Sequence, residues 1–228
     1  MFYDLHIHSC LSPCGDSDMT VNNIVNMAVL KELDVIALTD HNSAGNCPAF
    51  LKIAERAEIA AIPGMELTTS EEVHAICLFT DIRNALAFGE YVDRRLPDII
   101  NKPGVYGNQF LLNENDEIAG EIEKLLSNAA DISLFDLPML MREFSGVFFP
   151  AHIDRPSFSL LANLGFVPPE FSMDAFEIFS PANFDAILAS NPALSDLPML
   201  KNSDAHYLQD ISEPENTLDE RIARLLKL

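Results

Sequence analysis

The sequence predicts an α/β protein built around a parallel sheet. Along the first 80 residues, short apolar runs alternate with segments of helical spacing. This β-α-β-α-β order is typical of parallel strands joined by helical crossovers. The chain has 228 residues, of which 48% are hydrophobic and 21% are charged. That composition excludes a disordered, collagen-like or coiled-coil protein, and the length predicts a single domain over residues 1–228.

The elements of the first 80 residues follow from their patterning. Strands are predicted where the chain alternates or forms a short apolar run, at residues 2–9, 35–39, 59–64 and 74–79. Helices are predicted over residues 19–33 and 48–57. Asp18 or Thr20 can cap the first helix, and Pro48 opens the second.

The alternation is interrupted over residues 81–146. A Pro/Gly/Asn-rich stretch lies there, followed by helical patterns over 116–128 and 137–144. We interpret 81–146 as an insertion; two ordinary helices with a long loop are the alternative. Strands then return at 146–153, 175–180 and 198–206, with helices from Ser157, over 184–189 and from Asp219.

Charge and cysteine usage restrict the partners that the sequence predicts. Lys and Arg number 14 against 35 Asp and Glu, for a net charge of −21. We therefore expect no long nucleic acid and no anionic membrane surface as a partner. A small phosphate ester stays compatible, because bound metal cations reverse the local field. The chain starts with no signal-peptide pattern and has no membrane-spanning apolar run, so its four cysteines are expected to be reduced in the cytoplasm.

All six histidines lie at or near the ends of predicted strands. They are His6, His8, His41, His74, His152 and His206. His6 and His8 are two residues apart on one strand, so both project from the same face, roughly 7 Å apart. The carboxyl ends of barrel strands share one rim, and Glu66 follows another predicted strand. Imidazole with carboxylate suits Zn, Fe or Mn, so the pattern predicts a metal site.

Five motifs give the chain a family resemblance. They are DLHIHS (4–9), LTDHN (38–42), PGMELTTSEEVHAICLF (63–79), FPAHIDR (149–155) and NSDAH (202–206). In this order they resemble the PHP (polymerase and histidinol phosphatase) family of metal-dependent phosphoesterases. The resemblance implies a distorted seven-stranded (β/α)7 TIM-like barrel, with the 81–146 insertion as a lid over its mouth. It also implies two or three divalent ions, Zn, Mn or Fe, at the carboxyl rim.

The resemblance also assigns the ligands. One ion would be held by His6, His8, Glu66 and Asp204, and a second by Glu66, His74 and His152. A third would be held by His41 and His206, with one further ligand shortly after the first motif. No histidine occurs there. Asp16 is the predicted ligand, with Asp18 and Cys14 as rivals.

The same resemblance implies a mechanism in which the metals lower the pKa of a water that attacks phosphorus. Asp40 would orient the ring of His41 or shuttle a proton, unless it is only a hydrogen-bonded carboxylate at a strand end. Arg155 is the predicted phosphate clamp, since a guanidinium binds bidentately; a surface salt bridge is its alternative. Asn42 is a further candidate for substrate contact.

The function predicted is a metal-dependent phosphoric ester hydrolase acting on a small phosphate ester, a sugar phosphate or nucleotide. A phosphodiesterase or oligonucleotide hydrolase is the first alternative, and a non-catalytic, metal-binding regulatory module is the second. The full set of residues for two ions favours an enzyme over a degenerate module. No phosphate-loop, dinucleotide-binding or nucleophile-elbow motif suggests another chemistry.

Overall fold

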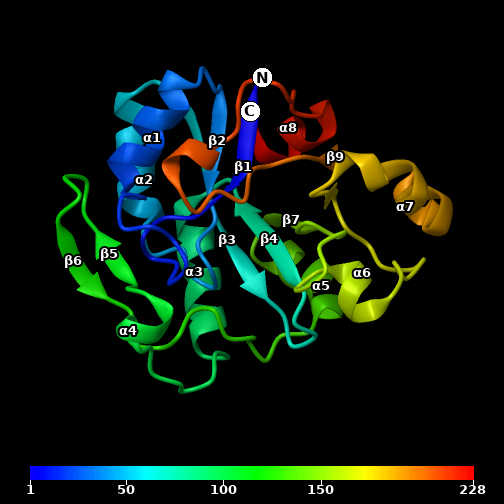
Figure 1. The fold of residues 1–228 in the computed structure, drawn as a ribbon, viewed down its shortest axis with the longest axis horizontal. Helices are drawn as coiled ribbons and strands as arrows, with labels where there is room; N and C mark the ends of the chain where they lie inside the picture. Colours follow the sequence, from blue (N-terminus) through cyan, green and yellow to red (C-terminus); the bar gives the residue numbers. More distant parts are fainter.

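Five strands form the central sheet of the molecule (Figure 1). The computed structural model, which describes residues 1–228, places them in the order β1-β2-β3-β4-β7. They are β1 (Tyr3–Ile7), β2 (Val35–Leu38), β3 (Ala60–Thr68), β4 (His74–Phe79) and β7 (Gly146–Pro150). Strands β1, β2 and β3 are parallel, whereas β4 runs antiparallel to both β3 and β7. The α/β class is confirmed, but the sheet is mixed rather than parallel.

The reversal at β4 has a simple cause. Strand β3 continues to Thr68, well beyond the end predicted at residue 64, and β4 begins at His74. The connection of residues 69–73 is too short for a parallel crossover, which takes about a dozen residues or more. The two strands therefore form an antiparallel pair, with Thr68 opposite His74.

Two of the other four strands form a separate parallel pair, β8 (Phe176–Glu177) and β9 (Met199–Leu200). The predicted closed barrel of seven strands is thus not observed. Individual hydrogen bonds nevertheless link the two sheets. The N–H of Ile153, after β7, donates to Glu177 (2.9 Å), and the N–H of His8, after β1, donates to Ala205 (3.0 Å). The segments that follow these strands therefore meet at one end of the fold.

Two apolar clusters support this arrangement. The smaller one, of 15 buried residues, includes Leu5 of β1, Leu78 of β4, Phe149 of β7 and Leu200 of β9. Ile222, from the last helix, joins it. The strands thus surround a common core. The larger cluster, of 48 buried residues, fills the space between the strands and the helices.

The helices lie around the sheet (Figure 1). They are α1 (Val21–Leu30), α2 (Cys47–Arg56), α3 (Ile82–Asp93), α4 (Pro103–Tyr106), α5 (Leu137–Glu143), α6 (Leu160–Leu164), α7 (Phe184–Ser190) and α8 (Glu220–Leu226). Thr20 rather than Asp18 caps α1, since its hydroxyl accepts the N–H of Asn23 (3.3 Å). Pro48 lies in the first turn of α2, where its missing N–H costs nothing.

Residues 81–146 contain two helices that pack on the sheet, α3 against β3 and β4 and α5 against β7. Sequence patterning missed α3. Between them lies a hairpin of β5 (Phe110–Leu112) and β6 (Ile118–Glu121). The helix predicted over 116–128 is therefore wrong. Asn113 accepts the N–H groups of Asn115 and Glu117 and so makes a turn instead, a competition typical of asparagine.

The hairpin packs beside α1 and α2 (Figure 1). The hydroxyl of Thr20 donates to Asp116 (2.6 Å), and the N–H of Leu112 donates to Asn46 (2.8 Å). All four cysteines are free; Cys14 is exposed and the other three are buried. None of the helices has the length and apolar character needed to cross a bilayer.

Candidate metal centre

Strand directions bring the predicted ligands to one edge of the fold. His6 lies on β1, His8 and His41 follow β1 and β2, and Glu66 lies near the end of β3. His74 is the first residue of β4. Because β4 runs against its neighbours, its first residue reaches the same edge as the last residues of the other strands. Residues far apart in the sequence thus converge at one site.

Glu66 occupies the centre of this cluster and is 1% exposed. One oxygen, Oε1, lies 2.8 Å from Nδ1 of His74, 3.2 Å from Nε2 of His152 and 3.3 Å from Nε2 of His6. The other, Oε2, lies 3.0 Å from Nδ1 of His41 and 3.4 Å from Nε2 of His8. A single carboxylate therefore contacts five imidazoles, as a bridging ligand between ions would.

Asp204 supplies a second carboxylate. Its Oδ1 lies 3.1 Å from Nε2 of both His6 and His8, and its Oδ2 accepts a hydrogen bond from Arg155. The ring of His206 stacks on that of His8, with centroids 4.2 Å apart. All eight predicted ligands other than Asp16 thus contact at least one other member of the cluster.

Three groups of ligand atoms are compact enough to hold an ion. One is His6, His8, Glu66 and Asp204, the same four residues that the motifs assign to the first ion. The others are His41, Glu66 and His74, and His8, His41 and His206. The second predicted set is thus modified: His41 joins Glu66 and His74, while His152 lies beside them against Glu66.

The charges of the cluster compensate one another. Burial alone would raise the pKa of Glu66, but His74, His6 and His41 hold it well below its usual range. Burial would lower the pKa values of His6 and His41, yet nearby carboxylates raise both well above the ordinary histidine value. Only for His74 does burial prevail and lower the pKa. The carboxylates and imidazoles of the cluster thus stabilise one another's charged forms.

The side chains fit divalent ions on a second ground. Three buried atoms in the cluster make no well-aligned hydrogen bond: Nδ1 of His152, Nδ1 of His41 and Oδ1 of Asp204, although the last two lie 3.0–3.1 Å from other members of the cluster. Buried polar atoms are nearly always paired, so an unpaired set at one place indicates a missing partner. Mixed imidazole and carboxylate donors suit Zn, Mn or Fe.

Glu177 is a residue of this site that sequence patterning missed. Its Oε2 lies 3.1 Å from Nδ1 of His6 and accepts the amide of Asn202 (2.7 Å), while Oε1 accepts the N–H of His152 (3.0 Å). It is 2% exposed, inside the apolar run AFEIFS. A carboxylate within a buried strand was the signal, because such a charge needs a partner.

Asp40 does not orient His41 as predicted. Its two oxygens accept hydrogen bonds from Ser9 and from the hydroxyl of Ser12 (2.7 Å each). The Ser12 oxygen also lies 2.9 Å from Nδ1 of His8. Because the Ser12 proton goes to Asp40, its oxygen accepts from His8 Nδ1–H, which leaves Nε2 of His8 free for an ion. Asp40 thus fixes the tautomer of His8 through Ser12.

At the third predicted ion position the structure favours Cys14, a rival of Asp16. Both lie outside the three compact groups, and Oδ1 of Asp16 accepts the N–H of Asp18 (2.9 Å). Cys14 instead lies against the cluster, with its Sγ 3.1 Å from Nε2 of His206. Burial would raise the pKa of the Cys14 thiol, but His206 and His41 lower it to about 5.

The cluster opens into a pocket of about 140 Å³, lined by ligands and by Arg155, Ser157 and Phe158. The guanidinium of Arg155 pairs with Asp204 and lies 4.5 Å from the ring centroid of Phe179. Its side chain is 30% exposed. A cation held in this way, at the wall of a histidine-lined pocket, has room to accept an anionic group.

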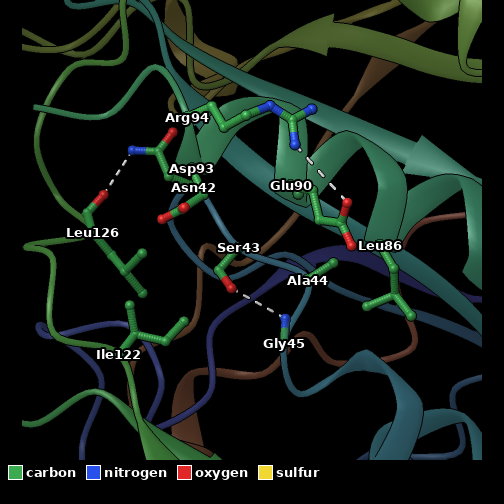
Figure 2. A pocket seen from close by; sticks show the side chains of 11 residues that line it. Asn42, Ser43, Ala44, Gly45, Leu86, Glu90, Asp93, Arg94, Ile122 and Leu126 are labelled. Carbon is green, nitrogen blue, oxygen red and sulfur yellow. Dashed lines mark hydrogen bonds and ion pairs between the residues drawn. The ribbon is translucent and has the colours of Figure 1, made fainter.

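Asn42 does not face that pocket with a free amide. Its Nδ2 donates to the carbonyls of Leu126 (2.6 Å) and Asn128 (2.9 Å), and its Oδ1 accepts the N–H of Thr68 (3.0 Å). Figure 2 shows the first of these bonds at the edge of a larger cavity of about 370 Å³ beside α3. No histidine lines that cavity. Asn42 therefore joins two segments of the fold rather than binding substrate.

Comparisons with known proteins agree with this arrangement. A family model described as "PHP domain" matches residues 4–144. The 5'-3' exoribonuclease Rnm of Salmonella typhimurium is 33% identical over 87 residues, which cover 36% of this chain and 29% of that protein. The chain thus spans under a third of this curated relative.

Two solved structures share the fold. One, from Bifidobacterium adolescentis, is described as a metal-dependent phosphoesterase; the TM-score is 0.65 at 18% identity, covering 99% of this chain and 95% of that one. The other is a lesion-specific endonuclease from Pyrococcus furiosus, with a TM-score of 0.61 at 21% identity, covering 90% of this chain and 48% of that one.

These relatives correct one prediction from composition. The net charge of −21 led us to expect no long nucleic acid as a partner. That expectation is wrong, because an exoribonuclease and a lesion-specific endonuclease are among the relatives. Net charge sums the whole surface, whereas the field that a phosphate meets is set locally, above all by bound cations.

Proposed function

Because the chain belongs to the PHP domain family, as its motifs predicted, we propose that it hydrolyses phosphoester bonds with two or three divalent ions. The observation that carries the proposal is the convergence of six histidines on Glu66 and Asp204, beside a pocket that four of them line. No other site in the fold gathers donors of this kind. The relatives are hydrolases of phosphate esters by description.

Each residue of the site has its own role in the proposed reaction. Divalent ions bound there would activate water and neutralise charge on the phosphoryl oxygens. Glu66 belongs to two of the compact groups and would contribute to two ion positions, and Asp204 would hold the first ion together with His6 and His8. Asp204 also holds Arg155 at the pocket wall, where the remaining guanidinium N–H groups bind a phosphate oxygen.

We propose a nucleotide or oligonucleotide as the substrate class, in preference to a sugar phosphate. The pocket, at about 140 Å³, takes a phosphate group but leaves the rest of a nucleotide outside. Two aromatic rings are exposed there. Phe158 lines the pocket and stacks on His74, and Phe179 lies against Arg155. Exposed aromatic faces beside a cationic group are suited to stacking of bases.

The test compares substrates on the purified protein, first stripped of metal and then given Mn or Zn. The substrates are a chromogenic phosphomonoester, its diester analogue and a short oligonucleotide. We expect metal-dependent cleavage, fastest on the oligonucleotide, and loss of it in Glu66→Gln. Arg155→Ala should also impair cleavage. Arg83→Ala is its matched control and should not, because Arg83 is an exposed arginine away from the site.

Other outcomes separate the alternatives. Fastest turnover of the monoester, with sugar phosphates cleaved best, would contradict the substrate class and leave a small-ester phosphatase. Stoichiometric metal binding without turnover of any substrate would contradict the enzyme and leave a metal-binding regulatory module.

We propose further that the hairpin of β5 and β6 shapes entry to the site. The N–H of Phe110 donates to Cys10 (3.2 Å), which lies in the loop after the first motif. Replacing residues 113–117 by a shorter turn should change the ratio of diester to monoester turnover while leaving metal content unchanged. Equal activities on every substrate would contradict this role.

A further inference from the structure

We propose that Cys14 is a metal ligand and that its thiolate completes the third ion position together with His41 and His206. This inference rests on the metal centre proposed above. It goes beyond that centre because it adds a sulfur donor to a set of nitrogen and oxygen donors. It also implies a different metal preference at one of the ion positions.

The geometry around His206 carries the inference. Nδ1 of His206 lies 2.8 Å from the carbonyl oxygen of Asp204. A carbonyl can only accept, so Nδ1 bears the proton and Nε2 keeps its lone pair. That Nε2 lies 3.1 Å from Sγ of Cys14. The backbone therefore fixes the tautomer in which His206 turns a ligating atom towards the sulfur.

The loop is held in this position by its own backbone. The N–H of Asp16 donates to the carbonyl of His206 (3.0 Å), and the N–H of Gly15 donates to Ser12 (2.8 Å). A Cβ at Gly15 would lie 2.4 Å from the Ser9 carbonyl oxygen, so the chain can pass here only with glycine. Cys14 is thus presented to the cluster by a tight, anchored turn.

A second observation points to an absent partner at the same place. His41 is 6% exposed, and its Nδ1, which lies 3.0 Å from Oε2 of Glu66, makes no well-aligned hydrogen bond. It belongs with His8 and His206 to one of the compact ligand groups. This group contains three imidazoles, and His8 is shared with the first ion position. It therefore has no anionic ligand of its own. Oδ1 of Asp16 already accepts the N–H of Asp18 (2.9 Å), whereas Sγ of Cys14 lies 3.1 Å from Nε2 of His206.

A thiolate ligand changes which metal ions this position prefers. Sulfur donors favour zinc and other soft or borderline ions, whereas carboxylate and water favour magnesium and manganese. A coordinated thiol is also deprotonated outright. We therefore expect zinc or cobalt at the third position to be held more tightly than manganese, and by a margin that depends on Cys14.

Cobalt titration of the full-length protein tests this without reference to activity. The expected result is up to three bound ions and a sulfur-to-cobalt charge-transfer absorption in the near ultraviolet. Cys14→Ser should abolish the absorption and weaken the last ion at least tenfold. Cys14→Asp should restore binding of that ion without the absorption. Cys47→Ser is the matched control, because its buried sulfur faces the carbonyls of Leu38 and Gly64 and a hydroxyl can replace it.

Thiol labelling provides an independent readout. Cys14 is the one exposed cysteine, so the native, metal-free protein should take up one equivalent of iodoacetamide, and zinc should slow this at least tenfold. Unchanged labelling with zinc bound, or cobalt binding without the sulfur absorption, overturns the inference while the metal centre stands. Absence of any bound ion overturns both.

Discussion

The Glu177→Gln substitution should weaken the binding of a divalent ion 10- to 100-fold. Glu177 lies behind the ligands, with its Oε2 3.1 Å from Nδ1 of His6. A carboxylate in this place orients the imidazole and raises its basicity. Burial would raise the pKa of Glu177, but the charge of His6 keeps it below its usual range. Glutamine preserves the size of the side chain and removes that charge.

The substitution should change two free energies, that of metal binding and that of unfolding. The expected loss of affinity corresponds to about 1.4–2.7 kcal/mol of binding free energy. Separately, the glutamine amide places two N–H groups where a carboxylate accepts from His6, His152 and Asn202. One buried donor left unpaired costs about 1–3 kcal/mol of unfolding free energy. The two quantities therefore need separate measurements.

Competition with a chelator of known affinity measures the binding of the ion, and denaturant unfolding of the metal-free protein measures the free energy of unfolding. Asp174→Asn is the matched control. Asp174 precedes β8, accepts the N–H of Phe148 (3.0 Å) and contacts no histidine. Unchanged zinc affinity in Glu177→Gln, or an equal loss in Asp174→Asn, would refute the argument that Glu177 acts through His6.

Three further predictions follow from the same contacts. Raised pKa values of three site histidines stabilise the metal-free protein below about pH 6.5, and this stability is lost as pH rises through the folded-state values. The melting temperature of the metal-free protein should therefore fall as pH rises above about 6.5, and zinc should reverse the fall; a rise without zinc would contradict the charge assignment. Arg155→Ala should lower kcat/KM about 10- to 150-fold, the value of a charge-assisted hydrogen bond, and an effect under threefold would exclude a phosphate clamp. Phe149→Ala should cost about 3–5 kcal/mol in denaturant unfolding, because the ring is fully buried among the strands; a loss under 1 kcal/mol would contradict the shared core.

The sequence was most informative where chemistry and strand ends coincide. The motifs assigned His6, His8, Glu66 and Asp204 to one ion, and the structure brings the same four residues together in one compact group. His74 was named as a neighbour of Glu66 by its motif, whereas the strand pattern alone would have placed it elsewhere. In the parallel sheet that patterning predicts, the first residue of its strand would face the opposite edge. Only the antiparallel turn at residues 69–73 brings it to the site.

The sequence was least informative where a polar side chain has several possible partners. Asp40 and Asn42 lie within the second motif, and Asp16 follows the first. The side chain of each forms hydrogen bonds with the backbone or with serines. Spacing does not distinguish a carboxylate that closes a turn from one that faces a metal. The same reasoning explains the false helix over 116–128, where asparagine side chains compete for backbone N–H groups.

The acidity of the chain is compatible with a phosphoester substrate once the site is considered alone. Glu66, Asp204 and Glu177 carry three negative charges within the cluster, and a Cys14 thiolate would add a fourth. Three divalent ions would bring six positive charges, so the occupied centre would be positive by about two. Arg155 adds to this at the pocket wall. Attraction of the substrate should therefore depend on bound metal: Kd for a non-hydrolysable oligonucleotide analogue should rise steeply with salt only in the metal-loaded protein, because screening acts on the field that the ions create.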